Sequence, residues 1–231
     1  MAIGLPASAQ ELLVAAASDL NRAGPSLRLA FEKRAPVKVR ITYGSSGQLA
    51  RQIENGAPYD IYLSANDSYV NALTQAGHLR PDSVRTYALG RLGLWSADSK
   101  IRSLDGLVPP SIRHIAIANP SHAPYGVAAK EALKRIWSQL EGRIVYGENV
   151  LQAFQFAETG NAEAAVTAWS LVHDRGGLLL PAALHSPIRQ TGGVVASSRH
   201  VNDAARFVAF LTSPEARAIL KKSGFDLPAR P

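Results

Sequence analysis

Short apolar runs alternate with helical patterns along almost the whole chain, and this alternation restricts the possible folds more than any other feature. Eight runs are short and mostly lack polar alternation, which is typical of buried parallel strands. They are residues 12–17, 37–43, 60–65, 91–95, 114–118, 143–147, 164–168 and 194–197. Helical patterns lie between them, for example over residues 46–55 and 126–140. The alternation predicts doubly wound α/β folds, whose ligands bind at the carboxyl ends of the strands.

The length of the chain favours two lobes. Its 231 residues are 46% hydrophobic, which is enough for two hydrophobic cores. No linker rich in Pro, Gly or Ser divides the sequence, so we expect extended crossings near residues 88–90 and 191–194. This predicts a first lobe of residues 11–89 and 194–231 and a second lobe of residues 90–193. A two-segment hinge would join them, with the ligand cleft in between.

Four strand-to-helix corners have sequences that suit anion binding. Ser18 follows the first apolar run, and Ser46 lies in the segment Gly44-Ser45-Ser46-Gly47. A helix N-terminus offers free N–H groups and the positive end of its dipole, to which a serine adds a neutral O–H donor. Two later corners are similar. One lets the N–H groups of Tyr125 and Gly126 point at a ligand, and the segment Gly147-Glu148-Asn149-Val150 forms the other. One such corner usually only caps a helix, but four together predict a site for a small tetrahedral oxyanion.

Charge and composition restrict the partners. The chain has 25 Lys and Arg against 18 Asp and Glu, a net charge of +7 that would be compatible with nucleic acid. The basic residues occur singly, however, without basic runs or interleaved aromatics, so we expect no nucleic-acid partner. The sequence has no cysteine, and its six histidines lack metal-ligand spacing. We therefore expect no metal and no cofactor, and no apolar run is long enough for a transmembrane helix.

The N-terminal residues 1–10 resemble a processed leader. Ala7-Ser8-Ala9 has the small-x-small form of a signal-peptidase site, although the charged and apolar regions that normally precede one are missing. The segment is expected to be a signal-peptide remnant or a tag, which points to export.

A serine hydrolase is the competing class of function. Ser18 or Ser46 would then be a nucleophile activated by a histidine. The segment Gly44-Ser45-Ser46-Gly47 does not match the G-x-S-x-G nucleophile elbow, and no histidine is near either serine in the sequence. Whether a histidine lies near either serine in the folded protein stays open. We expect a binding protein and not an enzyme.

The chain resembles the periplasmic molybdate-binding proteins that serve ABC transporters. The resemblance covers nearly all of residues 11–227, with its segments in the order of that family. They are residues 15–18, 44–47, 52–60, 63–65, 119–120, 124–126, 129–133, 148–150 and 224–225. The resemblance implies a periplasmic binding protein type II-like fold. It also implies a periplasmic monomer that binds molybdate or tungstate with high affinity and delivers it to the membrane permease of an ABC transporter.

The resemblance also implies which residues hold the anion. They are the hydroxyl and N–H of Ser18 and of Ser46, and the N–H groups of Tyr125 and Val150. Some members of the family add a tyrosine hydroxyl from a strand position where this chain has Ala168. The N–H of Asp19 is the expected replacement. Its carboxylate is expected to turn away from the anion or to cap the following helix, because a buried like-charge contact is costly.

The donors alone do not identify the anion. Molybdate, tungstate and sulfate have the same charge and shape, so selection among them would depend on the size of the cavity. A binding protein for sulfate, phosphate or another tetrahedral oxyanion is therefore the alternative.

Overall fold

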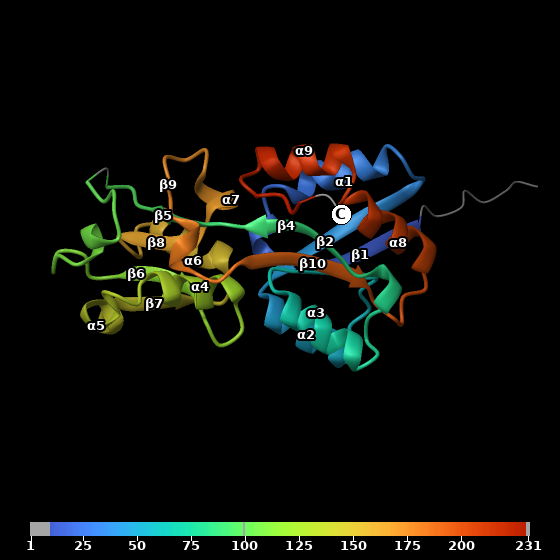
Figure 1. Ribbon diagram of the computed structural model, residues 1–231, viewed down its shortest axis with the longest axis horizontal. Coiled ribbons are helices and arrows are strands. Elements are labelled where there is room, and N and C mark those ends of the chain that lie inside the picture. Colours follow the sequence, from blue (N-terminus) through green and yellow to red (C-terminus); the bar gives the residue numbers. More distant parts are fainter. Residues whose placement is uncertain (1–9, 99, 230–231) are drawn as a thin grey trace, which may run out of the picture.

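The computed structural model describes residues 10–98 and 100–229 and shows an elongated molecule of two α/β lobes (Figure 1). Each lobe contains one five-stranded sheet with helices packed against it. The α/β two-lobed fold predicted from the sequence is confirmed. None of the helices within the described ranges is both long enough and apolar enough to span a membrane. The predicted leader remnant lies outside the described residues, except for Gln10, which begins the first strand.

The first lobe has the strand order β2-β1-β3-β10-β4. Its strands are β1 (Gln10–Ala17), β2 (Val37–Gly44), β3 (Ile61–Ser64), β4 (Arg85–Gly90) and β10 (Ile188–Val194). Strand β1 is parallel to β2 and β3, whereas β10 is antiparallel to β3 and β4. The helices of this lobe are η1 (Ser18–Leu20), α1 (Gly24–Glu32), α2 (Ser46–Glu54), α3 (Asp67–Gln75), η2 (Pro81–Ser83), α8 (Val201–Phe210) and α9 (Pro214–Lys222).

Helices cover both faces of the first sheet, which explains why its inner strands β1 and β3 read as apolar runs. Val14 and Ala16 of β1 pack in a cluster with α1, α8 and α9. Ala15, between them, packs on the opposite side with α2 and α3. Successive residues of a strand point to opposite faces, so a strand buried on both faces has no polar positions.

The second lobe has the strand order β7-β6-β8-β5-β9. Its strands are β5 (Leu92–Trp95), β6 (Ile115–Ala118), β7 (Ile144–Gly147), β8 (Ala164–Ala168) and β9 (Leu178–Leu179). Strand β6 is parallel to β7 and β8, and β5 is antiparallel to β8 and β9. The helices are η3 (Asp105–Leu107), α4 (Pro124–Ala132), α5 (Trp137–Leu140), η4 (Glu141–Arg143), α6 (Val150–Glu158), α7 (Trp169–Val172) and η5 (Ala182–Leu184).

Several local predictions were wrong. The sheets are mixed and not wholly parallel, because β5 and β10 enter them antiparallel. The strand expected at residues 194–197 ends at Val194, and β4 and β9 had not been expected. The helix expected over residues 126–140 is two helices, because the turn between them replaces the i to i−4 pattern with shorter bonds such as Lys134 N–H to the Glu131 carbonyl.

The chain passes between the lobes twice. It leaves the first sheet after Gly90 and enters the second at Leu92. It returns to the first lobe between β9 and β10. Residues 188–193, which had been assigned to the second lobe, therefore lie in the sheet of the first. The glycine pair that suggested a hinge lies inside β10, opposite β3. A Cβ on Gly192 would be only 2.4 Å from Leu63 Cδ2, so glycine here meets a packing requirement.

Candidate oxyanion site between the lobes

A small cavity lies where four strand-to-helix corners of the two lobes meet. It is lined by Ala17, Ser18, Asp19, Gly44, Ser45, Ser46, Ala65, Ala123, Pro124, Tyr125, Asn149 and Val150. The corners are those between β1 and η1, β2 and α2, β6 and α4, and β7 and α6. The room in it for the centre of a water-sized molecule is about 10 Å³, close to the roughly 10–15 Å³ that one bound water needs. The cavity therefore suits a small ion.

All the residues predicted to bind the anion line this cavity. Ser18, Asp19 and Ser46 come from the first lobe, and Tyr125 and Val150 come from the second. Ala168, which stands where some relatives have a tyrosine, is buried at the end of β8 and pairs with Leu92.

Two serine hydroxyls have protons available for a ligand. Ser46 Oγ accepts a hydrogen bond from the N–H of Ala65 at 3.1 Å. Ser18 Oγ accepts a longer one, at 3.5 Å, from the N–H of Leu151. Both serines are buried. A hydroxyl that accepts from the backbone keeps its own proton for another acceptor, so both serines can donate into the cavity.

The first turns of α2 and α4 have no side-chain cap. Ser45 and Ala123 are the N-cap residues, and within these described segments neither side chain binds the N–H groups of its helix. The first N–H groups of a helix have no partner inside it and carry the positive end of its dipole. The N–H groups of Ser46 and Tyr125, at the first two positions of these helices, are therefore suited to hold an anion.

The side chain that caps helix α6 binds its second and third N–H groups and not the first. Asn149 Oδ1 accepts hydrogen bonds from the N–H groups of Leu151 and Gln152, at 3.0 and 3.1 Å. The cap does not bind the N–H of Val150. A capping side chain normally reaches the second or third N–H of a helix, so an asparagine here stabilises α6 while the N–H of Val150 stays available.

Asp19 carries a carboxyl group in the cavity lining, and it is fully buried. Its Oδ2 accepts hydrogen bonds from the Tyr125 hydroxyl at 2.9 Å and from Gln190 Nε2 at 2.7 Å. Its other oxygen, Oδ1, is buried without a hydrogen-bond partner among the described residues. Burial raises the pKa of this carboxyl to about 7, although the bonds from Tyr125 and Gln190 act to lower it.

A second contact between the lobes, which the sequence did not predict, lies beside the cavity. Ser45 Oγ of the first lobe lies 2.8 Å from His122 Nδ1 of the second, and it donates to the His122 carbonyl at 2.6 Å. The N–H of Gly47 donates to the same carbonyl at 3.0 Å. Gln48 Nε2 donates to Glu148 Oε2 at 2.5 Å. We call these residues the latch: Ser45, Gly47, Gln48, His122 and Glu148.

The latch brings a histidine to a serine, but in an arrangement that does not suit hydrolysis. The serine is Ser45, neither of the two weighed as nucleophiles, and it is buried. When its hydroxyl proton is donated to the His122 carbonyl at 2.6 Å, the contact with Nδ1 requires the tautomer in which Nδ1 carries the proton and donates to Oγ. A general base needs a free lone pair on the nitrogen that faces the hydroxyl. His122 stands in the Pro120-Ser121-His122 segment before α4, which is the signal the sequence offered for it.

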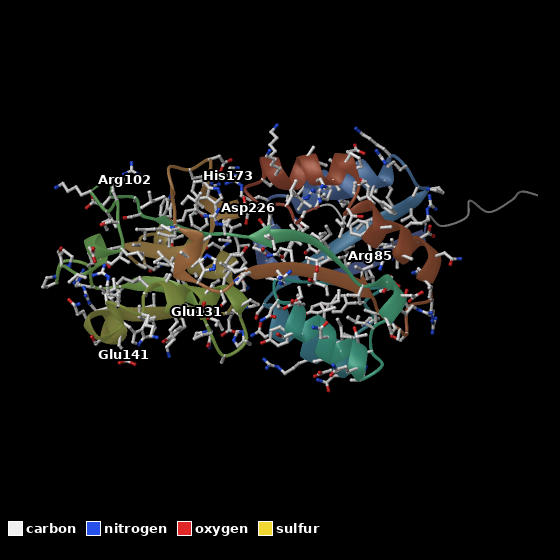
Figure 2. The ribbon with its side chains drawn as sticks, viewed as in Figure 1. Arg85, Arg102, Glu131, Glu141, His173 and Asp226 are labelled. Carbon is white, nitrogen blue, oxygen red and sulfur yellow. The ribbon has the colours of Figure 1, made fainter. Side chains whose placement is uncertain are left out.

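Cationic side chains do not reach this cavity. Among the residues that the structure describes, no Lys or Arg lines it. Charged side chains such as Arg85, Arg102 and Glu141 lie on the outer surface instead (Figure 2). An anion in the cavity would therefore be held by neutral hydroxyls, N–H groups and helix dipoles.

Comparison with known proteins places this geometry in a family. The model of the bacterial extracellular solute-binding proteins matches residues 12–226. The molybdate-binding protein ModA of Rhodobacter capsulatus is 34% identical over 231 residues, which are 97% of this chain and 92% of that protein. ModA of Azotobacter vinelandii is also 34% identical, over 96% of this chain and 92% of that protein. These relatives are named as binding proteins and not as enzymes.

Solved structures show the same similarity. The periplasmic molybdate-binding protein of Azotobacter vinelandii superimposes with a TM-score of 0.88 at 33% identity, covering 94% of this chain and 99% of that one. The sulfate-binding protein SubI of Mycobacterium tuberculosis superimposes with a TM-score of 0.78 at 17% identity, covering 95% and 88%. At such low identity the second match shows a shared fold alone.

Proposed function

The chain belongs to the bacterial extracellular solute-binding proteins, in the family of the periplasmic molybdate-binding proteins, and from this we propose that it binds molybdate in the periplasm and delivers it to the permease of an ABC transporter. One observation carries the proposal. Four corners direct neutral donors into a small cavity that no Lys or Arg side chain among the described residues lines. The identity of the anion comes from the relatives.

The proposed donors are the hydroxyls and N–H groups of Ser18 and Ser46 and the N–H groups of Asp19, Tyr125 and Val150. Each hydrogen bond to a charged partner contributes roughly 1.5 to 3 kcal/mol. The N–H of Asp19 takes the role that a tyrosine hydroxyl has in some relatives. The main-chain donors of this set favour a fully deprotonated anion, because an N–H group has no lone pair to accept the O–H of a protonated one. Tungstate, with the same charge and shape, is the expected second ligand.

The lobes are proposed to close about the two crossings, at residues 90–92 and 180–188. Ser18 and Ser46 lie on one lobe and the remaining corners on the other, so the complete donor set exists only when the lobes are together. Contacts that bridge the lobes near the site support this, including the latch and the bond from Tyr125 to Asp19. Ligand binding and closure are then coupled.

Calorimetric titration with four oxyanions tests the proposal. Protein freed of bound anion by unfolding and refolding is titrated with molybdate, tungstate, sulfate and phosphate in turn. We expect one molybdate per chain, similar binding of tungstate, and far weaker binding of sulfate and phosphate. Sulfate binding as tight as molybdate binding would favour the alternative, and no heat with any of the four would contradict an oxyanion site.

A further inference from the structure

The cavity places a buried carboxyl next to the proposed anion site with no cation to balance it. Asp19 follows Ser18 directly, lines the cavity and is fully buried. A dianion bound by Ser18 would bring two further negative charges close to this carboxylate. Like charges that share a buried site raise the pKa of the weaker acid.

Neutral groups surround the Asp19 carboxyl. Tyr125 of α4 and Gln190 of β10 donate to Oδ2, and Ser170 of α7 donates to the Asp19 carbonyl at 2.8 Å. Tyr87 of β4 lies behind them, with its hydroxyl 3.5 Å from Gln190 Oε1. Burial raises the pKa of Tyr125 and of Tyr87 well above the ordinary value, so both stay neutral.

The charged and titratable groups on the other elements around η1 have partners elsewhere or lie outside this network. Arg22, just after η1, binds Asp174 at 2.7 Å and the Leu171 carbonyl at 3.2 Å. His173, which follows α7 and is labelled in Figure 2, packs edge to face on the Trp169 ring. Tyr43 of β2 has its hydroxyl against Gly24 of α1, and burial raises its pKa to about 12. The part of the chain that the structure describes thus supplies no cation to Asp19.

We propose that Asp19 takes up one proton when the oxyanion binds, so that the loaded site holds the anion beside a neutral carboxylic acid. The inference rests on the proposed function. The proton comes from solvent and goes to Oδ1, the oxygen without a partner, while Oδ2 continues to accept from Tyr125 and Gln190. Burial in the closed arrangement supports this, because it raises the pKa of the carboxyl to about 7, close to neutrality, before the charge of a dianion is added.

Proton uptake makes anion affinity depend on pH in one direction. The carboxyl has a higher pKa in the loaded protein than in the free protein. Between these two values affinity falls as the pH rises, by at most about tenfold per pH unit. Below the lower value the carboxyl is already protonated in the free protein, and affinity no longer changes.

Calorimetry measures this proton directly. Molybdate is titrated from about pH 6 to about pH 8, in pairs of buffers that differ in ionisation enthalpy, and the difference in heat gives the protons bound per anion. We expect uptake that rises toward one proton at the alkaline end. The variant D19N should bind molybdate without this uptake and with affinity that is independent of pH. D60N is the control, because Asp60 is also buried but binds Leu13 and Ser198 away from the cavity, and it should keep the uptake.

A second variant keeps the test decisive if D19N fails to fold. Y125F removes the hydroxyl that lowers the pKa of Asp19, so the window of proton uptake should move to higher pH. An unmoved window would overturn the inference, as would binding by the wild type without uptake, or equal uptake by wild type and D19N. Failure of the wild type to bind molybdate at any pH is a different result, which overturns the proposed function itself.

Discussion

Ser45 Oγ and His122 Nδ1 lie 2.8 Å apart, although 77 residues and the boundary between the two lobes separate them. The contact can exist only when the lobes are together. Both side chains are buried, and the His122 main chain adds two further bonds to the first lobe, from Ser45 Oγ and from the N–H of Gly47. This pair stabilises the closed arrangement without belonging to the proposed donor set, so closure and anion contact can be separated by mutation.

Replacing His122 by alanine should shorten the time for which an anion stays bound. The variant loses the Ser45 contact of the imidazole but keeps its carbonyl. A net hydrogen bond of about 0.5 to 1.5 kcal/mol corresponds to a roughly 2- to 13-fold faster release, with little change in the association rate. Stopped-flow displacement by excess tungstate measures the release rate. H114A, at an exposed histidine of the same lobe, should release molybdate like the wild type. An unchanged rate in H122A would show that the imidazole contact with Ser45 does not hold the lobes together.

Removing either serine hydroxyl should weaken molybdate binding without unfolding the protein. S18A and S46A each lose one hydrogen bond to a charged ligand, which predicts roughly 10- to 150-fold weaker binding by calorimetry. S68A, at an exposed serine of α3, serves as the matched control. If both site variants bound molybdate as tightly as S68A, the anion would have to bind elsewhere.

Ionisation of Asp19 should lower the stability of the unliganded protein as the pH rises. The carboxyl has a pKa of about 7 when folded and about 3.9 when unfolded. A raised folded pKa gives a stabilising contribution below about pH 4 that is lost progressively toward about pH 7. D19N cannot ionise, so its melting temperature minus that of the wild type should increase across this range. A difference that stays constant with pH would show that the carboxyl is already solvated in the unliganded protein.

Molybdate should reduce the radius of gyration measured by small-angle X-ray scattering. The anion supplies the contacts that favour the closed lobes, whereas the free protein samples more open arrangements. Sulfate at the same concentration is the control for ionic strength. Binding seen by calorimetry with no change in radius would mean that the closed site forms without ligand.

The glycine pair in β10 gives a prediction about stability alone. G192A places a Cβ 2.8 Å from the Tyr62 carbonyl and 2.4 Å from Leu63 Cδ2, an overpacking that typically costs about 1 to 3 kcal/mol of unfolding free energy. G142A, where a Cβ meets nothing within 4 Å, should be close to neutral. Denaturant unfolding compares the two variants. Equal stability would show that Leu63 and the backbone of β3 can move to accept the methyl group.

Local signals in the sequence were sufficient to predict the four strand-to-helix corners. The position of a serine or an N–H donor at such a corner is set by the strand before it and the helix after it. Neighbouring residues were therefore enough to locate four of the donors, Ser18, Ser46, Tyr125 and Val150. The direction in which neighbouring strands pair could not be predicted in this way. Whether β10 is parallel or antiparallel to β3 depends on contacts between residues more than 100 positions apart, and the glycines that permit their close approach look the same as hinge glycines.

Side-chain contacts between the lobes were also beyond local signals. His122 could be read only as part of a turn before α4, since its partner Ser45 is in the other lobe. The Asp19 carboxyl was expected to turn away from the anion, but nothing in the sequence pointed to the Tyr125 hydroxyl, which reaches it from α4 of the other lobe. Both contacts depend on how two independently built sheets meet.

The two side-chain hydroxyls of the proposed donor set lie on the same lobe. Ser18 and Ser46 belong to the first lobe, while Tyr125 and Val150 of the second contribute only main-chain N–H groups. This arrangement favours a two-step order of binding. The anion first binds the lobe that carries the hydroxyls and loses part of its hydration shell there, and the second lobe then closes over it. Release would follow the reverse order, so a permease that separates the lobes would leave the anion exposed to solvent on the first lobe, held by five of its seven proposed donors.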